Sequence, residues 1–544
     1  MGRWSSTEAG RPGGPGPDAG GRDRARHGSL ATLALAAVVG LAACGVALFL
    51  AQLPLRRAVA AIAVMAICIF AAVSRRPRQA LLFCWVVSLT YNRNYFFESV
   101  EVLRESGSYG PYWNPSDIFL AALLALWAYE RIARKRAALP LGPAVWPWLA
   151  PFVAACLLSV LGARRMDWGA FEMLRVARIV LILWYVRFNV RAAEWWACVA
   201  GFAAAVLIQA TMGITYVATG TRPGLAALLG VEDGAELRAL LEGVTPEGYR
   251  RAEGTFGHPN TMALYLLLVG PLFLALGAAP LGRRARAACA VTGLVALVGI
   301  AVTLSRTSWT LVLVQAVVLA IGLAALRVVR VERALGVLCV GLFLGTLVLL
   351  PLARPIETRL TEDLREMLEF RAKHDRIALE IWQSAPLMGV GLNNYSDVLA
   401  RRGEPEVDVF LLIGEHVRTV LDLRVTAWVH NIYLLLLAET GAVGLLAFLL
   451  FLVGVTVMGV RALRAPGPVW AAAGLGLFVG TLAVHVHGLQ EAALWIDPDT
   501  YSFALVVGLL NAIPSLAQQD AGAPDGRQGV PWPRGGGEAG DRLL

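Results

Sequence analysis

The chain has 544 residues, of which 57% are hydrophobic and only 16% charged, and its formal net charge is +9. A soluble chain of this length would divide into domains with polar surfaces, so the composition excludes an ordinary soluble protein. Apolar runs of about 20 residues, long enough to cross a hydrocarbon core, recur instead. The basic residues gather mostly in short connections between these runs, where anionic membrane lipids, and no nucleic acid, are the natural partner. We therefore expect an all-α, polytopic membrane helix bundle of about 12–14 transmembrane helices.

The two ends of the chain differ from the rest in composition. Residues 1–28 are rich in Gly, Pro and Arg and lack apolar periodicity, and residues 517–544 resemble them. Both are predicted to be disordered tails.

Between the tails we expect an N-terminal transmembrane bundle (29–353), a helical loop (354–429) and C-terminal transmembrane helices (430–516). Fourteen apolar runs are candidate spans, and they lie near 29–51, 56–73, 79–91, 116–130, 143–161, 171–187, 194–218, 259–280, 287–304, 308–326, 334–353, 430–459, 468–488 and 500–515.

The loop 354–429 is polar but has amphipathic periodicity. Leucines spaced by four residues predict one helix over 360–371. A second helix is expected to start at Asp375 as its N-cap, and Asn393 is expected to cap a short third one. Together they predict a small helical cover on the bundle.

Basic clusters fall in every second connection, which is the positive-inside pattern. It predicts that these connections and both termini are cytoplasmic and that the loop 354–429 lies outside. Arg56-Arg57 and Arg164-Arg165 are exceptions on the outer side. The clusters lie at 75–78, 131–136, 187–191, 283–286, 327–333 and 461–464.

The first polar motif leads into the span at 259–280 and reads Arg250-Arg251-Ala-Glu253-Gly-Thr-Phe-Gly-His258-Pro259-Asn260. Its glycines predict a tight turn, and Pro259 suits a first helical turn. The N–H groups of a helix start with arginines beside it favour a phosphate. The alternative is an entry turn with interfacial arginines.

The second motif is Ser305-Arg306-Thr307-Ser308, where one span ends and the next begins with almost no loop. Helices on both sides hold Arg306 close to the outer membrane surface. It is either part of an anion site or a snorkelling arginine.

The third motif, His430-Asn431, begins the span at 430–459, directly after the helical loop. A histidine titrates near neutrality, so it can take a proton from a sugar hydroxyl, with Asn431 or Glu439 to orient it. The alternative is a helix cap or a packed residue.

Two further polar patterns are predicted on the outer side. Glu172, Arg175 and Arg178 form a stripe along one span, either as cavity lining or as a structural ion pair. Asp497-Pro-Asp499 is either a divalent-cation pair or a turn and N-cap, and the proline favours the turn.

Four motifs in this order resemble the O-antigen ligase and O-antigen polymerase superfamily, in detail over about 250–460. They are Arg251-x-Glu-Gly-Thr-Phe-x-His-Pro-Asn260; Leu304-Ser-Arg306; Arg376 followed by Trp382-x-x-Ala-Pro-Leu-x-Gly-Val-Gly-Leu-Asn-Asn-Tyr395; and Val429-His-Asn-Ile-Tyr-Leu-x-x-x-x-Glu439-x-Gly441-x-x-Gly444.

The resemblance implies a GT-C type glycosyltransferase of the bacterial inner membrane, with its active site facing the periplasm. Its donor would be a glycan on undecaprenyl diphosphate, and its acceptor lipid A-core or a growing glycan. By the family pattern, Arg251 and Arg306 engage the diphosphate and His430 activates the acceptor hydroxyl.

Fixed guanidiniums stabilise the charge that grows on a leaving diphosphate, so we expect no metal or other cofactor, and a base on the opposite face of the sugar gives inversion. We predict that His430 is catalytic and that the substrate-binding residues are Arg251, Arg306, Arg376, His258, Asn260 and Asn431.

Ligase, polymerase and protein-glycosylating transferase share these motifs and differ in acceptor, so the sequence leaves the acceptor open. A flippase for the same lipid-linked glycan is the alternative outside enzymes. It would place its charges in a central cavity, whereas the predicted charges lie at the outer edge, which favours chemistry.

Overall fold

The computed structural model describes residues 55–92, 95–96, 110, 112–133, 140–220, 249–336, 339, 350–361, 364–402 and 429–522. The chain forms two compact units, Met1–Ala63 and Val64–Leu544. Of the first unit only residues 55–63 are described, and they are helical. The predicted tail at 1–28, the span at 29–51 and most of the span at 334–353 lie outside the described residues, as does the tail beyond residue 522.

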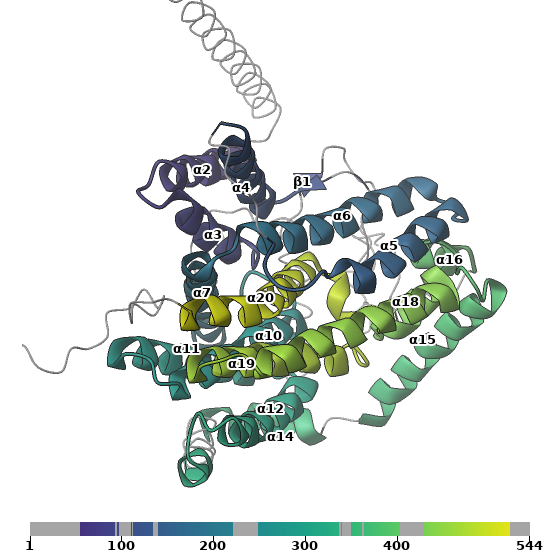
Figure 1. The fold of residues 1–544 in the computed structure, drawn as a ribbon. Coiled ribbons are helices and arrows are strands. Elements are labelled where there is room, and N and C mark those ends of the chain that lie inside the picture. Colours follow the sequence, from purple (N-terminus) through teal and green to yellow (C-terminus); the bar gives the residue numbers. More distant parts are fainter. Residues whose placement is uncertain are drawn as a thin grey trace, which may run out of the picture. The chain divides into compact units, whose positions relative to one another are not determined.

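Helices dominate the described chain (Figure 1). The N-terminal ones are α2 (Leu55–Ala72), α3 (Pro77–Ser88), α4 (Pro115–Ile132), α5 (Trp146–Leu161), α6 (Met166–Asn189) and α7 (Ala192–Thr219). The central ones are α10 (Pro259–Ala278), α11 (Arg283–Val302) and α12 (Arg306–Ala325). A 3-10 turn, η1 (Leu350–Leu352), then leads to α14 (Ala353–Thr361), α15 (Leu364–Ser384) and α16 (Tyr395–Arg402). The chain continues with α18 (Ile432–Leu463), α19 (Pro468–His487), η3 (Ala493–Trp495) and α20 (Asp497–Ala521).

Local sequence explains where many of these helices start. Helices α3, α4, α5, α10, α19 and α20 each carry a proline in the first turn, where its fixed φ suits a helix and its missing N–H costs nothing. In the described part of the α3–α4 connection, two short strands pair antiparallel, β1 (Tyr95–Phe96) and β2 (Tyr112–Trp113), and the apolar periodicity did not predict them.

Seven helices of the described chain are long and apolar enough to cross a membrane, namely α7, α10, α11, α12, α18, α19 and α20. This confirms an all-helical, polytopic membrane bundle. The bounds of these helices follow the predicted spans closely, but α20 continues to Ala521, beyond the predicted end of its span. Leu516 and Ala517 are buried, so packing extends this helix into the segment predicted as a tail.

Helix α10 lies at the centre and packs against α11 and α19 (Figure 1). Of its apolar window, 83% is buried, against 28% for α12. Helix α12 instead exposes Leu313, Val314, Val317 and Ile321, a surface that suits lipid chains. The bundle thus has a mostly buried central helix, α10, and a helix with an exposed apolar face, α12. Both begin near the connection between α19 and α20.

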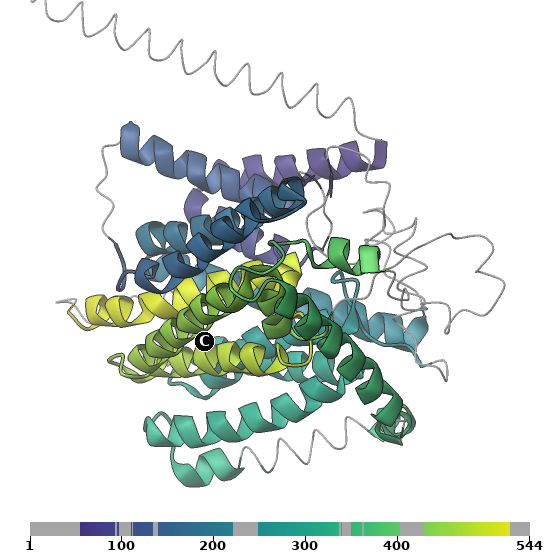
Figure 2. The ribbon, with the colours of Figure 1, turned by 90° about the vertical axis from the view of Figure 1, so that its right-hand side faces the viewer.

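The described part of the predicted loop, which reaches residue 402, is largely helical, and α15 contacts α18 (Figure 1; Figure 2). The two expected helices at 360–371 and from Asp375 are replaced by α14 and one continuous α15, so the predicted N-cap at Asp375 is wrong. Ile377 and Ile381 are buried, and the packing of this apolar face favours one helix that continues through residue 375. The third predicted helix is α16, which begins two residues after Asn393.

Helix α18 is interrupted at Gly441, whose φ of 68° and ψ of −171° leave the helical region. Backbone groups at such a break must find partners, because membrane interiors offer no water. The segment that follows α15 supplies them. The N–H of Ala442 donates to the carbonyl of Pro386 (2.9 Å), and the N–H of Gly391 donates to the carbonyl of Glu439 (2.9 Å). The glycine-rich motif after α15 therefore docks into the break in α18.

Candidate functional site

Polar side chains from four segments meet at Glu491, in the connection between α19 and α20. Its Oε2 lies 3.0 Å from Nδ1 of His430, at the start of α18. Its Oε1 accepts hydrogen bonds from Nδ2 of Asn260 (2.7 Å), at the start of α10, and from Nη2 of Arg371 (3.3 Å), on α15. We call these residues, together with Arg251, the Glu491 cluster.

Arg251 reaches the cluster because the segment before α10 lies along the end of α11. The N–H of Ala252 donates to the carbonyl of Val302 (2.9 Å), and Nε of Arg251 donates to the carbonyl of Thr303 (3.0 Å). Nη2 of Arg251 then donates to Oδ1 of Asn260 (3.1 Å). Asn260 therefore bridges the arginine and Glu491, and the guanidinium is fixed on two sides.

The predicted tight turn between Arg251 and His258 is built against α7. Gly254 has a φ of 56°, and a Cβ there would lie 2.3 Å from Oε1 of Gln209. The same Oε1 accepts the N–H of Thr255 (2.8 Å), and Nε2 of Gln209 donates to Oγ1 of Thr255 (2.7 Å). Glycine is required here because the turn needs both a left-handed residue and a close approach.

His258 is the N-cap of α10, and its Nδ1 accepts the N–H of Asn260 (3.1 Å). Burial lowers the pKa of this histidine to about 4, Glu491 opposes the shift, and Arg251 and His430 add to it. His258 is therefore neutral at physiological pH, as an acceptor at a helix start must be. Its contact with Asn260 places it beside the cluster.

The start of α12 is tied to the same connection. Oγ1 of Thr307 donates to Oε1 of Gln490 (2.5 Å), next to Glu491. Arg306 is the first residue of α12 and is half-buried, and the residue before Ser305, Leu304, has a φ of 52°. This left-handed residue turns the chain directly from α11 into α12, which explains the near absence of a loop.

Asn431, and not His430, caps α18. Oδ1 of Asn431 accepts the N–H groups of Tyr433 (3.0 Å) and Leu434 (3.2 Å). His430 precedes the cap and keeps 38% of its side chain exposed. The helix cap that the sequence suggested for His430 is therefore provided by Asn431, which fixes the start of α18 beside the cluster.

In the described ranges the carboxylate that contacts His430 is Glu491, not Glu439. Glu439 is buried within α18 and accepts the N–H groups of Asn393 (2.9 Å) and Tyr395 (3.1 Å), so it holds the segment between α15 and α16. The sequence offered one signal for Glu491, since it is the sole acidic residue of the connection 488–496.

Arg371, in the described part of the helical loop, joins the cluster. Its Nη1 also donates to the carbonyl of Gln490 (2.9 Å). Arg376 lies further along α15 with an exposed side chain, and it makes no hydrogen bond or ion pair with the described part of the chain. Arg371 stood in the predicted amphipathic pattern, but nothing in the pattern distinguished it as a site residue.

Electrostatics keep Glu491 ionised. Burial alone would raise the pKa of its carboxyl, but His430, Arg371 and His258 outweigh this and hold the pKa far below its usual range. A permanent carboxylate beside Nδ1 of His430 fixes the tautomer in which Nε2 carries the lone pair. A histidine that accepts a proton at Nε2 requires this tautomer.

The remaining polar stripe is structural. Arg175 and Glu172 form a buried ion pair, with Nε 2.7 Å from Oε1, and Nη2 of Arg175 donates to the carbonyl of Leu494 (3.3 Å). Asp497 begins α20, and its Oδ1 lies 3.8 Å from Nη1 of Arg175. The stripe therefore anchors η3 and α20 to α6.

Residues 291–449 match a family model described as O-Antigen ligase. No curated protein matches the chain. The matched residues include Arg306, Arg371, Arg376 and His430, whereas Arg251, Asn260 and Glu491 lie outside them. The cluster is thus assembled from both parts of the chain.

Proposed function

We propose, from the premise that residues 291–449 are an O-antigen ligase family domain, that this membrane protein is a glycosyltransferase. It moves a glycan from undecaprenyl diphosphate to an acceptor hydroxyl on the periplasmic face. The observation that carries the proposal is the contact of His430 with Glu491 in a cluster that also holds Arg251 and Arg371.

In the proposed reaction His430 acts as the base. Nε2 takes the proton of the acceptor hydroxyl, whose oxygen forms a new bond to the anomeric carbon. Glu491 stabilises the imidazolium that results, because a carboxylate 3.0 Å from Nδ1 favours the charged ring. Attack from the face opposite the leaving group inverts the anomeric centre.

The bond between the anomeric carbon and the diphosphate breaks as the new bond forms, and its electron pair stays on the diphosphate oxygen. We propose that Arg251 and Arg306 receive this charge, in place of a metal ion. Arg306 follows the end of α11 in the chain, and Arg251, which precedes α10, is oriented by hydrogen bonds to Thr303 at that end and to Asn260. Preorganised donors stabilise growing charge without reorganisation. We propose that His258, Asn260 and Asn431 line the site beside these two arginines. Arg376, which is exposed, would contact the donor or the acceptor outside the cluster.

We propose that the Glu491 cluster faces the periplasm and that both termini are cytoplasmic, which the alternation of basic connections supports. Reporter fusions at Ala372 and Ala133, both exposed, test this. Periplasmic signal is expected at Ala372 and cytoplasmic signal at Ala133. A cytoplasmic signal at Ala372 contradicts the proposal.

Deletion of the gene followed by glycan profiling tests the reaction and separates the acceptors. Long chains retained on the lipid carrier identify a ligase, and single repeat units identify a polymerase. Unchanged glycans in all fractions contradict a transferase of either kind. Lipid-linked glycan trapped on the cytoplasmic face would instead identify a flippase.

Glu491→Gln tests the role of the carboxylate in the purified protein. Because glutamine cannot stabilise an imidazolium, turnover is expected to fall about 10- to 100-fold while donor binding persists. Glu172→Gln, which removes a buried carboxylate paired with Arg175 outside the cluster, is the matched control. An equal loss in both variants would point to a general folding defect.

A further inference from the structure

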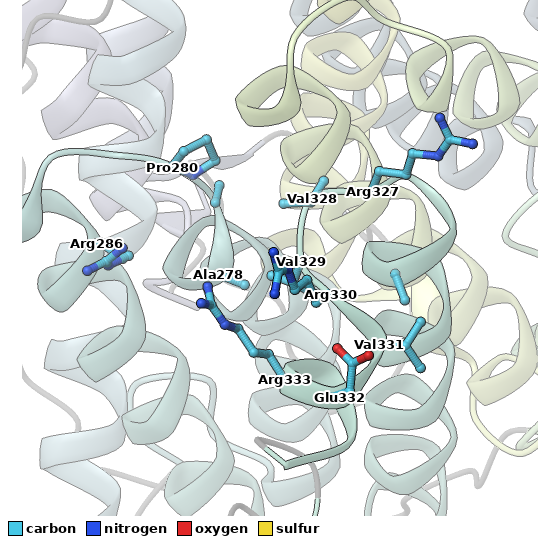
Figure 3. A pocket seen from close by; sticks show the side chains of 12 residues that line it. Ala278, Pro280, Arg286, Arg327, Val328, Val329, Arg330, Val331, Glu332 and Arg333 are labelled. Atoms are coloured by element: carbon cyan, nitrogen blue, oxygen red, sulfur yellow. The ribbon is translucent and has the colours of Figure 1, made fainter.

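A second polar site lies at the other end of α10, α11 and α12. Helices α10 and α12 begin near the Glu491 cluster and α11 ends there, so the opposite ends of all three meet about 30 Å away. A pocket of about 670 Å³ lies between them (Figure 3). Its lining residues are Ala278, Ala279, Pro280, Arg286, Ala324, Arg327, Val328, Val329, Arg330, Val331, Glu332 and Arg333.

The pocket is strongly basic, with four arginines against one glutamate. In Figure 3 the side chains of Arg330 and Arg333 extend toward Ala278, and Arg286 lies on the far side. Within the described ranges, none of the four guanidiniums has a hydrogen-bond or ion-pair partner from the protein, and all four side chains are exposed. Arg327 points away from this pair, so Arg330 and Arg333 are the two guanidiniums that lie together (Figure 3). Neighbouring guanidiniums that no protein acceptor pairs favour an external anion, and phosphate matches their geometry best.

The backbone at the pocket is fixed by a strained turn. Arg327 follows α12 with a φ of 56°, and its N–H donates to the carbonyl of Ala324 (2.9 Å). The N–H of Val328 donates to the carbonyl of Leu323 (2.9 Å), which completes a helix-terminating turn of the kind that glycine usually occupies. An arginine here accepts strain that glycine would avoid, and the turn directs residues 328–333 back across the helix ends.

The rest of the lining is apolar, and it continues into lipid-facing surface. Alanines, valines and a proline make up the remaining wall. On α12, Val317, Val318 and Ile321 are exposed in the turns that lead to the pocket. A water-soluble anion gains nothing from this surface. A phospholipid would place its phosphate among the arginines and its acyl chains along α12.

We propose that this pocket binds the phosphodiester headgroup of an anionic membrane phospholipid. The site is separate from the proposed transferase chemistry, because it lies at the other end of the helices and shares no residue with the Glu491 cluster.

The test uses the full-length protein purified in mild detergent, with phosphatidylglycerol as the probe and native mass spectrometry to measure binding. The double variant Arg330→Gln/Arg333→Gln removes two pocket charges. The matched control is Arg283→Gln/Arg284→Gln, which removes two exposed arginines from the start of α11 that do not line the pocket. Since a basic residue near a headgroup contributes about fivefold in affinity, the pocket variant should bind about 25-fold more weakly and the control nearly normally.

Two further arms identify the source of the phosphate. Phosphatidylcholine should bind much more weakly than phosphatidylglycerol, and inorganic phosphate at millimolar concentration should not displace the lipid. Equal losses in the two double variants, equal binding of both lipids, or displacement by inorganic phosphate would each overturn the proposal. If the double variant fails to insert, Arg330→Gln alone, with about a fivefold loss, carries the same test.

Discussion

Arginines lie at both ends of α10, α11 and α12, but only those at one end are hydrogen-bonded to acceptors in the described part of the chain. At the Glu491 cluster, Arg251 and Arg371 donate to named acceptors at 2.9–3.3 Å and lie beside a buried carboxylate. At the other end, Arg330 and Arg333 have no partner in the described parts of the chain. A guanidinium held on two sides has a fixed direction, as chemistry requires, whereas unpaired guanidiniums are available to a ligand from outside.

The difference follows from how each end is built. The cluster receives long connections and α15, and these bring carbonyls and the carboxylate of Glu491 to the helix ends. The arginine pocket is made of short turns whose carbonyls are used within the helices, as the turn at Arg327 illustrates. Short turns therefore leave the basic side chains without acceptors.

The largest expected effect is on His430. His430→Gln keeps hydrogen bonding but removes basicity, so turnover should fall about 10²–10⁴-fold while donor binding persists. The measurement is single-turnover transfer from a lipid-linked donor. Arg330→Gln, at the other end, should leave transfer unchanged. Near-normal transfer by His430→Gln would show that His430 is not the base, and the proposed difference between the two helix ends would fail.

Replacement of arginine by lysine should separate the ends next. Arg251→Lys and Arg306→Lys keep the charge but lose the planar fork, so transfer should fall roughly 10- to 100-fold. Arg330→Lys should change transfer less than twofold, because it serves neither leaving group nor acceptor. Expression and membrane insertion are measured in parallel. Equal, small effects in all three variants would show that Arg251 and Arg306 are snorkelling residues without a role in transfer.

A third variant should damage one end and spare the other. Gly441→Ala places a Cβ 2.2 Å from the carbonyl oxygen of Leu387 and strains a φ of 68°. It should cost about 1–3 kcal/mol of stability, displace the segment after α15 and reduce transfer. Phosphatidylglycerol binding should persist, since the arginine pocket shares none of these contacts.

The matched control for this variant is Gly467→Ala. Gly467 also has a left-handed φ, 87°, but nothing lies within 4 Å of its Cβ position. It isolates the backbone strain from the clash. Equal thermal destabilisation by both substitutions would show that the docked segment does not contribute.

The last prediction concerns pH. The pKa of His258 is lowered to about 4, mainly by burial, whereas an unfolded histidine has a pKa of about 6.5. Below pH ~6.5 the His258 side chain binds a proton in the unfolded chain but not in the folded one. The free energy of unfolding should therefore decline as pH falls from about 6.5 to about 4. The pKa of Glu491 is also lowered, which adds to the loss at the acid end of this range and below it.

Thermal unfolding at several pH values checks this prediction. His258→Asn keeps a side-chain acceptor at the N-cap but cannot titrate, so its pH dependence should be shallower. An identical slope in the variant would show that the stability of the site end does not depend on a neutral His258.

The sequence by itself determined the class of the fold and the bounds of its main helices. Apolar runs of about 20 residues and prolines at helix starts are local signals, and α10, α18 and α19 begin within two residues of the expected positions. The three motifs were also visible, because polar groups at the ends of apolar runs are conspicuous. The roles predicted for His430, Arg251 and Arg306 remain predictions that the variants above test.

Only the tertiary structure decided which groups meet. Glu491 lies 61 positions from His430 in the chain, and its contact depends on how α18, α19 and α20 pack. The choice of Arg371 over Arg376 depends on which face of a continuous α15 turns toward the bundle, and periodicity had divided that helix in two. Local patterns record how each segment meets apolar or polar surroundings. They hold no information on the distant backbone that completes a break at Gly441 or the carboxylate that orients a histidine, because those partners are chosen by packing.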